Sequence, residues 1–262
     1  MNPVEAIRGD GPIVLGQPHS GIFLPDEVRA ALKAPARQLL DTGWRIPELY
    51  DGLAEGATIV RANFSRYVID ANRPPDGASL YPGQNTTGLV PSSDFDGRYI
   101  WETSPDEAEI ARRLEQFHRP YHDALAGELE RVQSVHGFAL LYDCHSIRST
   151  TPYLFEGTLP DLNIGTNSGS SCASEIEQAV AHVCENSAFT SVLNGRFKGG
   201  WTTRHYGQPE AGIHAIQMEI AQSAYLESEL PPFTISQEKS EKLRLVLAEV
   251  FDAITKALGE LK

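Results

Sequence analysis

Short apolar runs alternate along the chain with longer amphipathic stretches. The short runs contain β-branched residues and are flanked by turn residues, a combination that favours buried strands over helix fragments. They lie at residues 13–15, 58–60, 67–69, 138–142, 191–193 and 215–218. Because amphipathic stretches separate them, the pattern predicts an α/β fold with a mixed, largely parallel central sheet that helices cover on both faces.

Three amphipathic stretches predict helices. In the first, Ser104 is expected to be the N-cap and Glu107 its capping-box partner. Pro120 should kink or split this helix, because proline cannot donate the helical hydrogen bond. A second helix is expected over 170–183, and a last one from about Ser236, where apolar residues recur along one stripe.

Residues 74–97 interrupt the alternation. The segment holds Pro, Gly, Asn, Ser and Thr without an apolar period, so it is predicted to be a long ordered loop. Loops of that length inside compact domains are often functional. No repeat or interdomain linker is apparent elsewhere, and we expect a single α/β hydrolytic domain over residues 1–262.

Composition narrows the class of protein. The chain has 262 residues, and 22 basic against 35 acidic side chains give a formal net charge of −13. Such an acidic chain has no general electrostatic reason to bind nucleic acid or an anionic membrane. It lacks the roughly 18 to 20 consecutive apolar residues of a membrane span and the pattern of a secretory signal. We therefore expect a cytoplasmic enzyme or small-molecule binder.

Two histidines are expected at one edge of the sheet. His19 follows the first predicted strand and His145 follows the strongest one. Ligands of open α/β sheets bind at the carboxyl ends of strands, and imidazole is the commonest metal ligand. Asp143, two residues before His145, would lie on the same strand face and could fix the tautomer of its ring. The pair favours a metal, although each histidine alone could equally be a hydrogen-bonded loop residue.

A catalytic zinc usually has three protein ligands and one open position. Asp41 is the candidate for the third ligand. Glu48 and Asp51 lie close to it in the sequence, and spacing alone does not exclude them. Asp41 could instead cap the helix that contains Ile46, a position that aspartate often fills.

Glu219 lies in a strongly apolar run, between Met218 and Ile220. An ionised carboxylate is costly to bury without a partner. A nearby metal-bound water would compensate this cost and make Glu219 a general base. Pairing with an arginine is the alternative.

Three arginines are candidates for binding an anionic substrate. Arg66 and Arg73 flank the 67–69 run, and the arginine fork can make two hydrogen bonds to one carboxylate. Either could instead form a structural ion pair with Asp70. Arg204 lies in the glycine-rich segment 199–207, which we interpret as a substrate loop because glycines let the backbone approach a ligand closely.

His118 and His122 have the four-residue spacing of helical zinc sites. Pro120 lies between them, and no glutamate follows His118 as it does in helical zinc proteases. A polar cluster at the helix kink is therefore the preferred interpretation. Either histidine could still line the active site.

Together, these segments resemble the N-formylglutamate amidohydrolase family. The matching segments, in the order of the family, are Pro18-His19-Ser20-Gly21, Asp41-Thr42-Gly43, Ser65-Arg66, Asp70-Ala71-Asn72-Arg73, His118-Arg119-Pro120-Tyr121-His122, Asp143-Cys144-His145-Ser146, 199–207 and Gln217-Met218-Glu219-Ile220. Each segment is weak alone, and their common order over most of the chain carries the resemblance. Two positions depart from related patterns. Ile22 replaces the glutamate of zinc carboxypeptidases, and 41–45 reads Asp-Thr-Gly-Trp-Arg where the deformylating branch tends to have Asp-Trp-His.

The resemblance implies an enzyme that uses one Zn²⁺ to hydrolyse N-formyl-L-glutamate, a small dianionic substrate, to formate and L-glutamate in histidine degradation. A different N-acyl amino acid, a cell-wall amide or non-catalytic binding are the alternatives. The more distant likeness to zinc carboxypeptidases and aspartoacylase-like deacylases implies a three-layer αβα sandwich of the zinc-exopeptidase type.

The resemblance also implies roles for particular residues. It assigns His19 and His145 to the metal, with Asp41 as the expected third ligand and Asp143 behind His145. It assigns Glu219 as general base. Substrate binding is expected of Asn72 and Arg73, and further of Arg66, Arg204 and His122.

Overall fold

The computed structural model describes residues 2–80 and 83–261, and within them the chain forms one seven-stranded mixed sheet. The strands are β1 (Val4–Ile7), β2 (Ile13–Gln17), β3 (Thr58–Ala62), β4 (Ala139–Ile147), β5 (Leu162–Gly165), β6 (Ser191–Leu193) and β7 (Ile213–Ala221). Their order in the sheet is β1-β3-β2-β4-β7-β5-β6. Strands β3, β2, β4 and β7 are parallel, whereas β1 and β5 pair antiparallel with β3 and β7. The prediction of a mixed, largely parallel sheet is confirmed.

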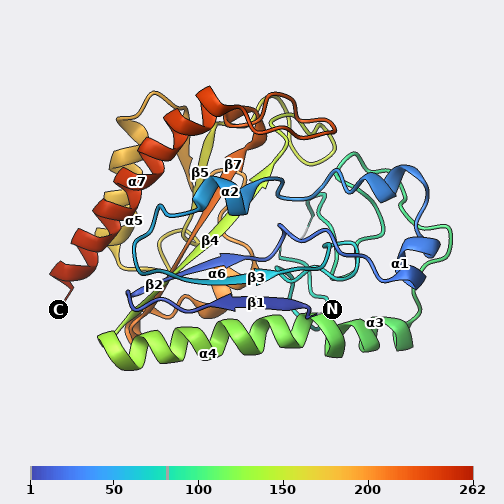
Figure 1. The fold of residues 1–262 in the computed structure, drawn as a ribbon, viewed down its shortest axis with the longest axis horizontal. Coiled ribbons are helices and arrows are strands. Elements are labelled where there is room, and N and C mark those ends of the chain that lie inside the picture. The colour runs from blue at the N-terminus through green and yellow to red at the C-terminus, as the bar shows by residue number, and fades with distance from the viewer. Residues whose placement is uncertain (1, 81–82, 262) are drawn as a thin grey trace.

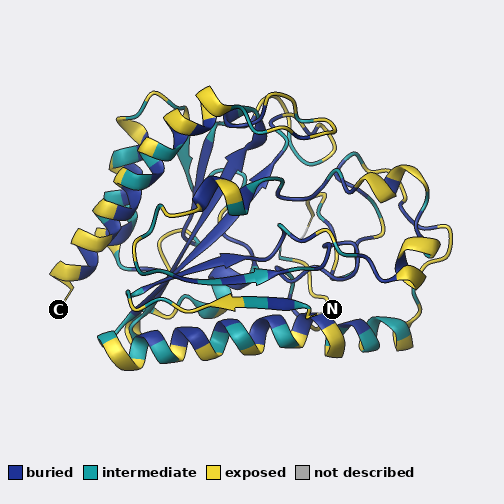
Figure 2. Cartoon of the chain, viewed as in Figure 1, coloured by how far each residue is buried: buried dark blue, intermediate teal, exposed yellow. Residues whose placement is uncertain are grey.

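Helices cover both faces of this sheet (Figure 1). They are α1 (Asp26–Ala31), α2 (Ile46–Tyr50), α3 (Glu107–Arg113), α4 (Arg119–His136), α5 (Ser174–Glu185), α6 (Trp201–Tyr206) and α7 (Gln237–Glu260). Successive residues of a strand point to opposite faces, so Tyr142 of β4 packs in the core under α2, α5 and α7, and Leu141 packs in the core over α4. The buried strands between helices with exposed outer surfaces make the three-layer arrangement (Figure 2). The closer likeness to zinc exopeptidases stays a prediction.

The long helix is not split at Pro120 but carries a π-helical turn just before it, and its start is not where we expected. Helix α3 passes directly into this turn (Leu114–His118), and α4 continues from it with Pro120 as its second residue. Asp106, and not Ser104, is the N-cap: its carboxylate accepts a hydrogen bond from the Glu109 N–H at 2.8 Å. The Ser104 hydroxyl instead contacts the hydroxyl of Tyr99.

The predicted strand at 67–69 is wrong. These residues belong to a buried turn, in which the Val68 N–H donates to the Ser65 carbonyl at 2.9 Å. Their apolar side chains pack in the core over α4, but their backbone does not pair with a strand of the described sheet. Burial alone therefore explains the apolar pattern. The 138–142 and 215–218 strands were predicted too short, because β4 continues to Ile147 and β7 to Ala221.

The remaining elements agree in part. Helix α7 begins directly after Ser236, close to its expected start, whereas α5 begins four residues later than predicted, at Ser174. In the described part of 74–97, from which only 81–82 are left out, the chain forms an irregular loop with buried Leu89 and Phe95. None of the helices in the described chain combines the length and apolarity needed to cross a bilayer.

Candidate active site

A cavity lies near the carboxyl ends of the parallel strands. His19 follows β2 by two residues, and His145 and Glu219 are register partners on β4 and β7. Its polar and charged lining includes His19, Arg66, Asn72, Arg73, His145, Arg196, Gln217 and Glu219. Segments far apart in the sequence thus supply imidazole, guanidinium, amide and carboxylate groups to one small volume.

The two histidines are close neighbours. Their ring centroids are 5.1 Å apart in an edge-to-face arrangement, and both side chains are buried. Nε2 of His19 donates to Asp70 Oδ1 at 2.7 Å, and Nε2 of His145 lies 2.9 Å from Asp143 Oδ2. Both rings therefore have a carboxylate at Nε2, an arrangement that leaves Nδ1 of each ring for another ligand.

The surroundings of the two rings shift their pKa values in opposite directions. Burial and the Arg66 guanidinium lower the pKa of His19 to about 3, against the opposing effect of Asp70. Burial also disfavours the charged form of His145, but the charge and hydrogen bond of Asp143 outweigh it and raise the pKa of His145. His19 is thus neutral at pH 7 and able to bind a cation.

Glu219 is a buried carboxyl group with an unusual pKa. Burial raises its pKa to about 7, although His145 and Arg66 favour the ionised form. The strand pairing of β4 with β7 places it beside His145. A carboxyl group that titrates near neutrality can both accept and return a proton, which is the requirement for general base catalysis.

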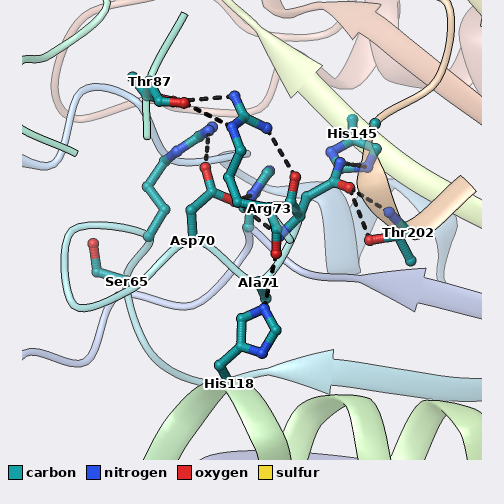
Figure 3. A network of polar contacts seen from close by, with 12 residues as sticks. Ser65, Asp70, Ala71, Arg73, Thr87, His118, His145 and Thr202 are labelled. Atoms are coloured by element: carbon teal, nitrogen blue, oxygen red, sulfur yellow. Dashed lines mark hydrogen bonds and ion pairs between the residues drawn. The ribbon is translucent and has the colours of Figure 1, made fainter. Parts of the chain in front are cut away.

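The turn that follows β3, residues 65–73, carries one wall of the cavity (Figure 3). We call it the polar wall because the side chains that the turn contributes to the cavity are charged or polar. Asp70 Oδ2 accepts from Arg66 Nη2 at 2.5 Å, and Asp70 Oδ1 accepts from the Asn72 N–H at 2.8 Å. Burial alone would raise the pKa of Asp70, but the charges of Arg66, His19 and Arg73 hold it well below its usual range. This carboxylate therefore organises the whole turn.

The side chains that follow Asp70 are also held in place. Asn72 Oδ1 accepts hydrogen bonds from the N–H and the hydroxyl of Thr202, both at 2.8 Å. Arg73 Nε donates to the Thr87 carbonyl at 2.7 Å, and Nη2 donates to the hydroxyls of Thr86 and Thr87. Arg66 lies over the Phe95 ring at 4.6 Å. The loop 74–97 thus forms part of the site.

Asp41 does not line the cavity. Its Oδ2 accepts from the Tyr67 hydroxyl at 2.7 Å and from the Phe95 N–H at 2.9 Å, and burial raises its pKa to about 6. It is not the N-cap of α2 either, since Arg45 occupies that position. Within the described residues, no three His, Cys, Asp or Glu side chains are grouped so that they could hold a metal ion. The structure therefore brings together two of the three expected ligands.

Two expected substrate residues also lie outside the cavity lining. Arg204 Nε donates to the Gly199 carbonyl at 2.8 Å, so it braces its own loop. His122 contacts the Ala71 carbonyl from the far side of the turn. Sequence reasoning missed Arg196, which does line the cavity and donates to the carbonyls of Leu154 and Asn85. The available signal was a basic residue three positions before the Gly199-Gly200 pair.

Comparison with known proteins decides the family. A model of the N-formylglutamate amidohydrolase family matches residues 11–226. The chain belongs to this family. An N-formylglutamate deformylase of Pseudomonas putida is 46% identical over 251 residues, covering 94% of this chain and 93% of the relative. One of Pseudomonas aeruginosa is 45% identical over 251 residues, covering 94% of each chain.

A solved structure supports the fold. The N-formylglutamate amidohydrolase from Ralstonia eutropha JMP134 has a TM-score of 0.82 at 23% identity, covering 98% of this chain and 99% of the other. The resemblance drawn from the sequence is thus confirmed, and this member of the N-formylglutamate amidohydrolase family is a hydrolase with the cavity as its candidate active site.

Proposed function

We propose that the chain hydrolyses N-formyl-L-glutamate to formate and L-glutamate in this cavity. Relatives that cover nearly the whole chain at 45–46% identity carry the name of that activity. The observation that carries the proposal is the lining itself, where Arg66, Arg73 and Arg196 share one cavity with the buried carboxyl of Glu219. Guanidinium groups suit the two carboxylates of the substrate, and a base suits the amide bond. A role in cytoplasmic histidine degradation rests on the resemblance alone.

Glu219 is the general base in this proposal. It accepts a proton from the attacking water and returns it to the nitrogen of the leaving glutamate. Its pKa of about 7 suits both steps, since a much stronger acid would not accept the proton and a much weaker one would not return it. Arg66 lines the same cavity and can stabilise the oxyanion that forms on the formyl oxygen.

Asn72, Arg73 and Arg196 bind the substrate carboxylates. The first two are fixed by Thr202 and Thr87, so their donors are oriented before the substrate arrives. Arg196 takes the place that the sequence had suggested for Arg204, because it faces the cavity. A dicarboxylate therefore has separate cationic anchors for its two ends.

His19 and His145 are the proposed ligands of one Zn²⁺. Zinc–nitrogen bonds are about 2 Å long, so two rings that share an ion must be neighbours, and a separation of 5.1 Å meets this requirement. Carboxylates behind both rings are the usual support of zinc-binding histidines. Oδ2 of Asp41 is taken by the Tyr67 hydroxyl and the Phe95 N–H, so Asp41 would have to act as the third ligand through Oδ1, which has no hydrogen-bond partner among the described residues. Bound there, zinc would activate water and polarise the formyl carbonyl.

Formate release from N-formyl-L-glutamate by the purified protein tests the proposed function. N-formyl-L-glutamine and N-acetyl-L-glutamate, offered at the same concentrations, test the need for the second carboxylate and for the small acyl group. We expect hydrolysis of N-formyl-L-glutamate to be clearly preferred. A preference for another N-acyl substrate, or no hydrolysis of any, would reject the proposal.

A further inference from the structure

Two histidines outside the cavity lining hold the turn that carries its polar wall. His118 Nε2 lies 2.9 Å from the Arg73 carbonyl oxygen, and His122 Nε2 lies 2.8 Å from that of Ala71. Figure 3 shows His118 extending from the helix towards this turn. A carbonyl oxygen only accepts hydrogen bonds, so each ring must carry its proton on Nε2.

The helix is built to present both rings on one side. His118 ends the π-helical turn and His122 lies in the first turn of α4, and residues four apart share one helix face. The two carbonyls that they contact belong to alternate residues of the turn. Both side chains are buried, at 3% and 9% exposure, so solvent does not compete strongly for these hydrogen bonds.

Helix α6 supports the same arrangement from a second direction. The hydroxyl of Tyr206 lies 3.0 Å from Nδ1 of His122 and 3.3 Å from the His122 carbonyl oxygen, so it contacts this residue at its ring and at its backbone. Trp201 packs edge-to-face on His122 with centroids 4.6 Å apart. Its neighbour Thr202 binds Asn72, so α4 and α6 fix the backbone and a side chain of one turn.

Both rings are neutral at physiological pH. Burial and the neighbouring His118 lower the pKa of His122 to about 3, and burial lowers the pKa of His118. The centroids of the two rings are 4.3 Å apart, a distance at which two charged imidazoles would repel each other. Neutral rings with Nε2–H therefore supply donors to the turn without placing positive charge behind Arg73.

We infer that His118 and His122 are positioning residues, which act on the substrate through the turn that they hold. They fix the carbonyls of Arg73 and Ala71, and thereby the direction of the Asn72 and Arg73 side chains and the place of Asp70 behind His19. The inference deepens the proposed function and rests on it, because its kinetic test measures KM for a dicarboxylate substrate.

Paired substitutions separate the hydrogen bond from mere packing. Glutamine at either position keeps an N–H donor near the place of Nε2, whereas methionine keeps similar bulk without a donor. We expect His118→Met and His122→Met to raise KM for N-formyl-L-glutamate by about tenfold, the effect of one buried hydrogen bond. His118→Gln and His122→Gln should restore KM to within about threefold of the parent.

His205→Met is the matched control. His205 stacks on Trp201 in the same cluster with centroids 4.4 Å apart, but its ring is exposed and it is not among the residues that contact Ala71 or Arg73. Its KM should stay at the parent value. An equal rise of KM in His205→Met, or no difference between the glutamine and methionine variants at equal Tm, would overturn the inference.

A spectroscopic measurement keeps the inference testable if the methionine variants do not fold. In the ¹⁵N-histidine spectrum of the unmodified protein, both rings should show the Nε2–H tautomer from pH 6 to 8. Finding Nδ1–H on either ring would overturn the inference whatever the kinetics. If the protein folds with both rings as Nε2–H but does not hydrolyse N-formyl-L-glutamate, the proposed function fails and the hydrogen bonds to the turn stand.

Discussion

At the residue scale, two buried carboxyl groups of the site behave in opposite ways. Asp70 contacts Arg66 and His19, and these positive or donating neighbours hold its pKa well below the usual range. Glu219 is also buried, but the effect of burial dominates and its pKa rises to about 7. Asp70 is therefore a permanent structural anion, and Glu219 is the group that can exchange protons during turnover.

Replacing Glu219 by Gln should lower kcat by about a hundredfold or more, the scale of general base catalysis. The amide has nearly the same shape but cannot accept the proton. Unchanged circular dichroism and unchanged metal content would show that the fold and the ligands are intact. A kcat within a few fold of the parent would contradict the assigned role.

The same substitution should change the pH dependence of stability. The pKa of Glu219 rises from 4.5 to about 7 on folding, so the folded protein binds the proton more tightly than the unfolded chain. The contribution of Glu219 to the free energy of unfolding is then highest below pH 4.5. It falls as the pH rises through about 7, by at most about 3 kcal/mol. Denaturant unfolding at pH 5 and 8 should show a smaller loss in Glu219→Gln than in the parent. Equal losses would contradict the raised pKa.

Arg196 offers a test of substrate recognition. Arg196→Gln should raise KM for N-formyl-L-glutamate by ten- to a hundredfold, about the effect of a charge-assisted hydrogen bond. Hydrolysis of N-formyl-L-glutamine should change much less, since it lacks the second charge. Arg204→Gln is the matched control, because Arg204 lies in the neighbouring segment but does not line the cavity. A similar rise of KM in both variants would count against a specific role of Arg196.

There is a physical reason why the sequence predicted only some of these residues. His19, His145 and Glu219 follow from strands whose ends meet at one edge, so their proximity was predictable. The position of Asp41 depends on Tyr67 and the Phe95 N–H, which no local pattern reveals. His118 and His122 were predicted to pack at the helix kink, and only the fold shows which carbonyls they contact.

At the scale of elements, the apolar runs predicted β2, β3, β4, β6 and β7 and missed β1 and β5. The sequence of β1 includes the charged Glu5, and that of β5 includes the polar Asn163, so neither strand forms a continuous apolar run. The 67–69 run was assigned as a strand because its residues are apolar. This apolar character reflects burial in the core and not pairing with another strand. Hydrophobic pattern reports burial directly and secondary structure only indirectly.

The start of α3 is a second element that can be tested. Asp106→Ala should destabilise the protein by about 1 kcal/mol, because it removes the acceptor of the Glu109 N–H at the helix N-terminus. Ser104→Ala should have a smaller effect, since Ser104 is not the cap. Urea unfolding of both variants measures the difference. A larger loss in Ser104→Ala would return the helix start to the position that the sequence suggested.

At the scale of the whole molecule, a strongly acidic chain surrounds a locally cationic cavity. The formal net charge is −13, yet three arginines line the site. Net charge argues against nucleic acid as a partner in general terms but carries no information about the cavity, because a field averaged over the surface does not describe a small enclosed volume. The local positive charge comes from the grouping of Arg66, Arg73 and Arg196, which suits an anionic substrate.

The proposed metal would join the site to the stability of the whole molecule. An ion that binds only the folded protein stabilises it by mass action, by about 2.7 kcal/mol at a hundredfold excess over Kd. If His19 and His145 hold Zn²⁺, then Zn²⁺ added to chelator-treated protein should raise its Tm and restore deformylation. The Tm of His145→Ala should not respond, whereas His182→Ala, a change on α5 away from the cavity, should respond like the parent. Full activity in protein shown by elemental analysis to be metal-free would reject the zinc proposal and leave Glu219 and the arginines as the working groups of the site.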